Sequence, residues 1–424
     1  MTSLISPQDF WTLWALILSG TALAIWLEQT QKWAAKLSGP VLALLIAMLL
    51  SNTGLVPARS PAYDFVDDYL VPLAIPLLLF RANALHIVRS TGRLFLAFHL
   101  SALGTLAGTF LAVFLLKGTI ASPDLEHAAG MMSASYIGGA VNFMALKTSY
   151  QVRPEVADPL IVADNFVMAV VFIALLAAAA SAFFRRRYPH PHSLDANSAE
   201  AENLAARHWQ RKGIGLLDLG KALAVACVVV AAARLMERAV RPAFGDVSQA
   251  SFALQMLQVL CTNQFVLITG VSLLVATVFH RPLAAINGPE ELGTLMLYLF
   301  LFCLGLPADL RMVLVQAPLF FVFCAVIAGV NLTWTLLWGK VLRFNLEELL
   351  LAVNANLGGA PSAAAMAISA GWPRLVLPGI LVGIWGYVIA TPIGVLIVEL
   401  LLRWAPVSAP DGGLTLWSFG AIGG

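Results

Sequence analysis

The sequence predicts an all-α polytopic membrane protein with about 10 to 12 transmembrane segments in two repeats, which we expect to be inverted. Hydrophobic residues make up 60% of the 424 residues and charged residues only 11%, whereas soluble domains are roughly half apolar and about a quarter charged. Apolar runs of helical length recur along the whole chain. Two glycine-rich stretches, 135–142 and 355–362, read almost alike, and we expect a broken or re-entrant helix at each of them.

Eight apolar runs are long enough to cross roughly 30 Å of hydrocarbon as a helix that rises about 1.5 Å per residue. They lie near residues 11–27, 40–57, 93–116, 160–184, 214–236, 262–280, 318–338 and 376–402. Four other runs are weaker, two because they are short and two because Gly, Asn, Ser and Pro interrupt them. These are 66–80 and 290–306, then 125–147 and 347–369. We expect the first run to be retained, because residues 1–10 lack the basic region of a cleaved signal peptide.

Charge and cysteine usage argue against several classes of partner. The formal net charge is +2 and the basic residues fall in short loops, so nothing favours nucleic acid. The four cysteines lie inside apolar runs without paired spacing, which predicts buried thiols in place of disulfides or a zinc site. The lipid bilayer and a small-molecule solute are therefore the expected partners, and a homo-oligomer stays open.

One long polar stretch, 185–212, divides the chain into a first membrane repeat, 1–184, and a second, 213–424. The interrupted run is the fifth of its half in both cases. The third run of each half also ends alike: residues 79–85 in the first half resemble residues 306–311 in the second. These matches predict an internal repeat, although apolar helices can also resemble one another through composition alone.

The charges of the loops bear on the direction of the repeat. Basic loops after the first and third runs, together with the acidic residues Asp64, Asp67 and Asp68, place the N-terminus outside the cytoplasm. If all six runs of the first half crossed, Arg185, Arg186 and Arg187 would then lie outside, against the same rule. The conflict disappears if one run per half, either the short one or the interrupted one, fails to cross. Each half then crosses five times and the repeats are inverted.

Polar residues flank both glycine pairs in places where lipid would make exposed backbone costly. These residues are candidates for binding the solute or an ion, although the same side chains could serve only to satisfy the broken backbone, and small residues also allow close helix packing. The candidate substrate-binding residues are Ser135, Gly138, Gly139, Asn142, Asn354, Asn356, Gly358, Gly359 and Ser362.

Asp164 and Asn165 are the candidates for coupling transport to an ion. They lie about one turn into the sixth run, where a carboxylate can bind Na⁺ or exchange a proton. The alternative is that Asp164 is a helix-start residue, favoured by the helix dipole. For Gly104 and Gly108 we expect close helix packing, and for Asn263 and Asn331 we expect hydrogen bonds between helices.

The sequence lacks the motifs of the competing membrane enzymes. No H-E-x-x-H, no Gly-x-Ser-Gly and no Gly-x-Gly-Asp partner for Tyr63-Asp64 occurs, and there is no phosphate-binding Walker loop. We therefore expect no catalytic residues, no metal site and no cofactor, with Na⁺ or H⁺ as the coupling ion.

Several stretches carry a resemblance to a known family. Residues 61–64, 70–82, 135–142 and 163–165 are similar to the YjcL-like membrane proteins, the domain-of-unknown-function 819 family. That family is grouped with the cation–proton antiporter and anion transporter superfamily, so the resemblance implies inverted repeats, unwound helices that cross at the bilayer midplane and secondary transport. One departure is Asn83, where we expect an acidic residue such as Asp309 in the second repeat.

Together these features predict a secondary active transporter that moves a small polar or anionic organic solute with Na⁺ or H⁺ by alternating access. The alternatives are a gated channel or, less favoured, an intramembrane enzyme. We expect a multi-pass protein of the cell (inner) membrane, although an organellar membrane stays open.

Overall fold

The computed structural model describes residues 3–31, 39–57, 59–191, 213–244, 251–306 and 310–404. Every regular element in these ranges is a helix, so the predicted all-α class is confirmed. Residues 192–212 of the polar stretch 185–212, and Asp309, lie outside the described residues.

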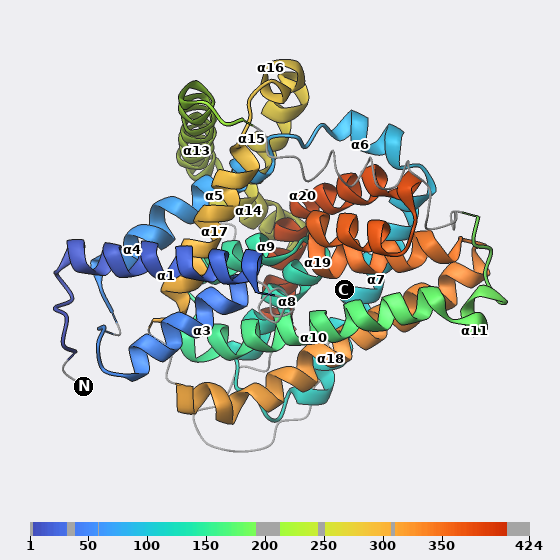
Figure 1. Ribbon diagram of the computed structural model, residues 1–424, viewed down its shortest axis with the longest axis horizontal. Helices are drawn as coiled ribbons and strands as arrows, with labels where there is room; N and C mark the ends of the chain where they lie inside the picture. Colours follow the sequence, from blue (N-terminus) through green and yellow to red (C-terminus); the bar gives the residue numbers. More distant parts are fainter. Residues whose placement is uncertain are drawn as a thin grey trace.

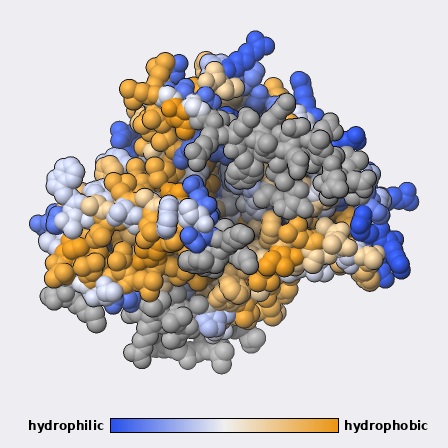
Figure 2. All heavy atoms as spheres, in the orientation of Figure 1, coloured by the Kyte–Doolittle hydropathy of each residue, from blue (hydrophilic) through white to orange (hydrophobic). Residues whose placement is uncertain are grey.

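Six helices are long and apolar enough to cross a membrane. They are α1 (Phe10–Thr30), α7 (Arg93–Leu116), α10 (Pro154–Ala180), α13 (Leu216–Phe244), α18 (Leu310–Val341) and α20 (Pro373–Trp404). Large apolar side chains on these helices, such as Leu115 and Ile173, face outwards, as expected of a surface whose solvent is lipid. Figure 2 shows such side chains over much of one face of the molecule. The protein is therefore a multi-pass membrane protein.

Two predicted spans differ from the observed helices. Run 40–57 forms α3 (Gly39–Asn52), which is only 14 residues long. Run 262–280 is one arm of a bent pair, α14 (Phe252–Thr262) and α15 (Gln264–Val278), whose axes meet at 71°. The bend has a local cause, because the side chain of Asn263 accepts hydrogen bonds from the backbone N–H groups of Phe265 and Val266 and so starts a new helix.

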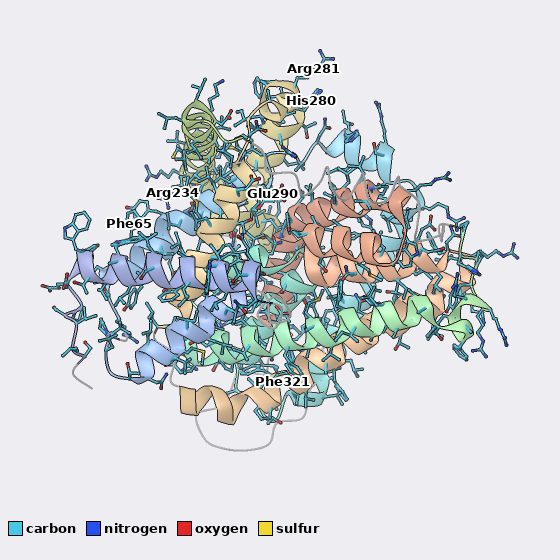
Figure 3. All side chains as sticks on the ribbon, in the orientation of Figure 1. Phe65, Arg234, His280, Arg281, Glu290 and Phe321 are labelled. Carbon is cyan, nitrogen blue, oxygen red and sulfur yellow. The ribbon has the colours of Figure 1, made fainter. Side chains whose placement is uncertain are left out.

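The remaining helices are shorter or interrupted. They are α4 (Pro61–Phe65), η1 (Val66–Leu70), α5 (Val71–Leu78), α6 (Ala84–Thr91), α8 (Asp124–Gly138), α9 (Ala140–Ser149), α11 (Ala182–Arg185), α16 (His280–Ala284), α17 (Pro289–Gly305) and α19 (Leu346–Ser369). Figure 3 shows Arg281 of α16 pointing away from the helices.

The helices pack in two groups that each draw on both halves of the chain. A lateral bundle contains α1, α3, α5, α13, α15 and α17, and a hairpin bundle contains α7 to α10 with α18 to α20. In Figure 1 the helices α1, α3 and α5 lie towards the left and α7 and α19 towards the right, and α10 and α18 run across the view below them. The bundles meet where α9 and α20 contact α5, α14 and α15. The boundary between repeats at 184 and 213 stays a prediction.

The close packing predicted for two glycines is confirmed in the hairpin bundle. A Cβ atom added to Gly104 would lie 3.1 Å from Asn331 Cα, and one added to Gly108 would lie 2.7 Å from the carbonyl oxygen of Ile327. The predicted bond between helices is also present, since Asn331 Nδ2 donates to Ser101 O at 2.8 Å and to Thr105 Oγ1 at 2.7 Å. These contacts hold α7 against α18 at the middle of both helices.

The first glycine motif is the tip of a helical hairpin. In a straight helix Asp124 and Arg153 would be about 43 Å apart, yet they form an ion pair. His127 and Tyr150 stack with ring centroids 5.3 Å apart. In sequence, the midpoint of each pair falls between Gly138 and Gly139. Helices α8 and α9 therefore run antiparallel from that point.

The second glycine motif also reverses the chain. Ser362 Oγ donates to Asn354 Oδ1 at 2.9 Å, whereas a straight helix would separate these residues by about 12 Å of rise. The break falls at Gly359, with φ 71° and ψ −168°. Gly139 has nearly the same conformation, φ 73° and ψ −178°. The expectation that the backbone leaves regular helix at both motifs is confirmed.

The two hairpins lie at opposite ends of α7. The first follows the C-terminal end of α7 at Leu116. The second begins beside its N-terminal end, where Arg93 Nη2 donates to Arg343 O at 2.6 Å and Arg93 Nε lies 3.9 Å from Glu348 Oε2. Since α7 has 24 residues, its ends are about 36 Å apart. The two hairpins therefore approach the centre of the bundle from opposite ends of α7.

Candidate functional site

The two hairpin tips meet on one side chain. A Cβ added to Gly139 would lie 3.5 Å from Tyr387 Cε1, and one added to Gly359 would lie 3.1 Å from Tyr387 Oη. Tyr387 is near the middle of α20, a helix of 32 residues, so the tips meet well inside the bundle. Tyr387 is not among the residues that the sequence predicts for the site. Its only signal is a tyrosine hydroxyl halfway along an apolar run.

Glycine is required at the first tip for two reasons. The φ of 73° at Gly139 lies in the left-handed region, which other residues adopt at a cost. Gly138 lies against the backbone of α20, where an added Cβ would be 2.3 Å from the carbonyl oxygen of Gly386. Gly386 in turn faces the carbonyl oxygen of Ile137, 2.4 Å from its own added Cβ. The tip is therefore held by contact between two backbones.

Side chains form hydrogen bonds with most of the backbone carbonyl groups that lose their helical partners at the first break. The carbonyl oxygen of Tyr136 accepts from Thr105 Oγ1 at 3.1 Å, and that of Gly138 accepts from Asn142 Nδ2 at 2.6 Å. Asn142 Oδ1 accepts in turn from Thr391 Oγ1 at 2.6 Å. In this conformation both ends of the Asn142 amide bind protein, and its contact with a solute stays a prediction.

Asp164 lies beside the first tip and is only 6% exposed. Ser135 Oγ donates to Asp164 Oδ2 at 2.7 Å, and the Tyr136 side chain lies next to the same carboxyl group. The alternative interpretation of Asp164 as a helix-start residue is wrong, because α10 begins at Pro154, ten positions earlier. Asn165 is half-buried, and its Nδ2 donates to the Ile161 carbonyl of its own helix.

The second tip contains buried polar atoms that lack a partner. Asn354 and Asn356 are both 0% exposed. Asn354 uses Oδ1 to accept from Ser362, and Asn356 uses Nδ2 to donate to Phe98 O and Ala352 O. None of the described residues bonds to Asn354 Nδ2 or Asn356 Oδ1. Each orphaned group costs about 1–3 kcal/mol when buried, so a bound solute, ion or water that satisfied them would be stabilised here.

Helix α10 contacts both hairpin tips. Met168, one turn beyond Asp164, places its Cε 2.3 Å from a Cβ added to Gly358. The face of α10 that carries Asp164 thus lies along both hairpins. Of the predicted site residues, the structure brings together Ser135 with Asp164, and Asn354 with Ser362.

Comparison with known proteins identifies the family of this chain. The family described as "Protein of unknown function (DUF819)" matches residues 15–404. The chain belongs to the DUF819 family. A relative in Bacillus subtilis (strain 168), "Uncharacterized membrane protein YjcL", is 42% identical over 398 residues, which cover 93% of this chain and 97% of the relative. The matched part of this DUF819 protein includes both hairpins and Asp164, so the resemblance to the family is confirmed.

Proposed function

We propose that the protein is a secondary active transporter that moves a small polar or anionic organic solute across the cell (inner) membrane, coupled to Na⁺ or H⁺. One observation carries the proposal: two hairpins approach from opposite ends of α7, their tips meet on Tyr387, and Asp164 lies beside the first tip. Paired broken helices of this kind mark the central sites of transporters built from inverted repeats.

The tips supply the groups that bind the solute. Both α9 and the second arm of α19 begin at a tip glycine and point their N-terminal ends, which carry partial positive charge, at Tyr387. The start of α9 has no side-chain cap. Asn142 N donates to the Gly139 carbonyl, and first-turn N–H groups of this kind can bind an anionic or polar group. The orphaned amides of Asn354 and Asn356 add one donor and one acceptor.

Asp164 and Ser135 are the coupling site. A carboxylate and a hydroxyl are oxygen ligands of the kind a hard cation such as Na⁺ binds, and a buried carboxyl can instead carry a proton. Movement of the hairpin bundle against the lateral bundle would expose the tips to each side in turn. No enzymatic step is part of the proposal.

Transport by purified protein in liposomes is the direct test. We expect saturable uptake that is driven by an imposed Na⁺ or H⁺ gradient and that shows counterflow of preloaded solute. Uptake without counterflow or saturation would indicate a gated channel. Chemical turnover of a solute without its translocation would indicate an enzyme and contradict the proposal.

Thiol labelling tests whether the hairpins enter from opposite sides. In a variant that lacks the four native cysteines, Gln151→Cys lies at the base of the first hairpin and Lys340→Cys precedes the second; both positions are exposed. We expect a membrane-impermeant maleimide to label them from opposite faces of oriented vesicles. Labelling of both from the same face would contradict the opposite approach and with it the inverted repeat.

Ser135→Ala tests the coupling site without removing the charge. Hydrogen bonds to charged groups contribute about 1.5–3 kcal/mol, so loss of the Ser135 hydroxyl should weaken ion binding by about tenfold or more. Na⁺-dependent and pH-dependent thermal stabilisation of the purified protein measures this. Ser133→Ala is the matched control, because Ser133 is buried on the same helix but donates to Thr109. Equal ion dependence in the two variants would remove Ser135 from the site.

A further inference from the structure

A cavity of about 420 Å³ lies between the two bundles, away from the hairpin tips. Its walls come from η1 and α5, the end of α9, α13, the α14–α15 bend and the end of α20. Glu399 on its wall is twelve residues beyond Tyr387 in α20, about 18 Å along the helix. The cavity therefore lies at the end of the molecule where the first hairpin has its base.

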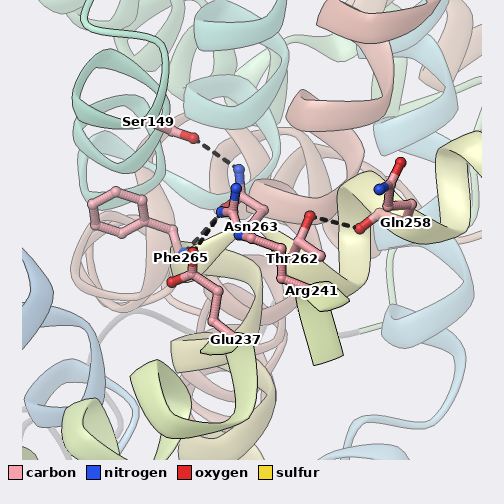
Figure 4. A network of polar contacts seen from close by, with 7 residues as sticks. All are labelled: Ser149, Glu237, Arg241, Gln258, Thr262, Asn263 and Phe265. Carbon is pink, nitrogen blue, oxygen red and sulfur yellow. Dashed lines mark hydrogen bonds and ion pairs between the residues drawn. The ribbon is translucent and has the colours of Figure 1, made fainter. Parts of the chain in front are cut away.

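A polar network closes one wall of this cavity. Asn263, at the α14–α15 bend, donates through Nδ2 to Ser149 Oγ at 2.7 Å and so joins the lateral bundle to the end of α9. Arg241 pairs with Glu237 on α13. Figure 4 shows these side chains together with Thr262 and Phe265. A wall held by bonds between bundles would change shape when the bundles move.

Several charged groups of the lining already have partners. Asp67 pairs with Lys147, whose Nζ lies 2.9 Å from Asp67 Oδ2, and Tyr150 Oη donates to Glu399 Oε1 at 3.0 Å. With Lys147 counted, the cavity has four carboxylates against three basic side chains. A solute that carried only negative charge would add to this imbalance, which disfavours it.

Two donors on the wall have no partner among the described residues. They are Arg234 Nε and Thr148 Oγ1, both buried atoms. The neighbouring nitrogen of the Arg234 guanidinium is anchored, since Nη2 donates to Asp68 O at 3.3 Å. In Figure 3 Arg234 is labelled where α13 approaches α5 and α17. A planar guanidinium with a free Nε–H is suited to bind a carboxylate, and Glu399 offers its second oxygen to an ammonium group.

We propose that this cavity binds a zwitterionic solute, an α-amino acid or a short peptide, with its carboxylate on Arg234 and Thr148 and its ammonium group on Glu399. The proposal rests on the transport function above and narrows its substrate to this class. The cavity is then an outer binding site on the route to the hairpin tips.

Binding to purified protein tests the chemical class. The probes are the twenty proteinogenic amino acids and dialanine, followed by the deaminated acid and the decarboxylated amine of any that raises the thermal midpoint. We expect the zwitterion to stabilise the protein and both single-charge analogues to bind at least about tenfold more weakly. Equal binding of the deaminated acid, or no stabilisation by any probe, would overturn the proposal.

Two substitutions place the bound solute in the cavity. Arg234→Gln and Glu399→Gln should each weaken binding at least about tenfold, and Glu399→Gln still offers an acceptor to Tyr150 and so should keep the fold. Arg238→Gln is the control, since Arg238 is exposed on the same helix and does not line the cavity. Unchanged affinity in both cavity variants, with intact size-exclusion profiles, would overturn the assignment.

Asp164→Asn separates this inference from the transport function. That variant should bind the zwitterion with wild-type affinity but fail to accumulate it. If no zwitterion bound in the cavity but the protein showed ion-driven uptake of a different solute, the inference would be refuted and the transport function would stand. Absence of ion-driven uptake of every solute tested would instead refute the transport function.

Discussion

Asp164→Asn is expected to abolish ion-driven accumulation while the protein still folds. The carboxyl group is buried and receives a hydrogen bond from Ser135 Oγ at 2.7 Å. An asparagine of nearly the same volume keeps an oxygen that can accept this bond, but it carries neither the charge that attracts Na⁺ nor a titratable proton. A gradient can drive a conformational change only through an ion that binds differently to the two states.

The measurement is the accumulation ratio in proteoliposomes with the ion gradient imposed, which should fall to its equilibrium value. Exchange of solute between the two sides should persist, because the hairpin tips are unchanged. Asn165→Ala is the neighbouring comparison. Since Asn165 Nδ2 bonds its own helix at Ile161 O, its replacement should reduce accumulation less. A wild-type ratio in Asp164→Asn, at unchanged expression, would exclude Asp164 as the coupling residue.

Gly386→Ala should destabilise the protein strongly. The added Cβ would lie 2.4 Å from the carbonyl oxygen of Ile137 and 3.3 Å from Gly138 Cα, which are backbone atoms that cannot rotate away. Overpacking a tight core costs about 1–3 kcal/mol and occasionally more. Displacing the first tip from α20 should also reduce transport.

Gly329→Ala in α18 is the matched control for this substitution. Gly329 is also a glycine inside a long helix, but an added Cβ there meets nothing within 4 Å. Alanine favours a helix over glycine by about 1 kcal/mol, so we expect an unchanged or slightly raised thermal midpoint in detergent. Equal midpoints for the two variants would contradict the backbone contact between α8 and α20.

The length and polarity of single helices were readable from the sequence. Run 93–116 was predicted and α7 spans Arg93–Leu116, because apolar length alone sets a span across lipid. The start of α10 was missed by six residues. Pro154 begins this helix, and the polar residues Glu155 and Asp158 in its first turns hid it from a search for apolar runs.

The partners of the site were not readable in the same way. Thr105 bonds the Tyr136 carbonyl across 31 residues, and Thr391 bonds Asn142 across 249. Tyr387 touches both tips although it is far from each in sequence. Such contacts depend on which helices lie side by side, and one sequence carries no direct record of that.

The sequence by itself determined that the chain lies in a membrane and that its helices break within the glycine-rich stretches 135–142 and 355–362. Lipid imposes both features locally, through the length of each apolar run and the cost of unpaired backbone. Only the tertiary structure decided that both breaks reverse the chain, that the tips meet on Tyr387, and that Arg234 and Glu399 line one cavity. These features depend on contacts between distant segments, so the packing of the whole bundle determines them.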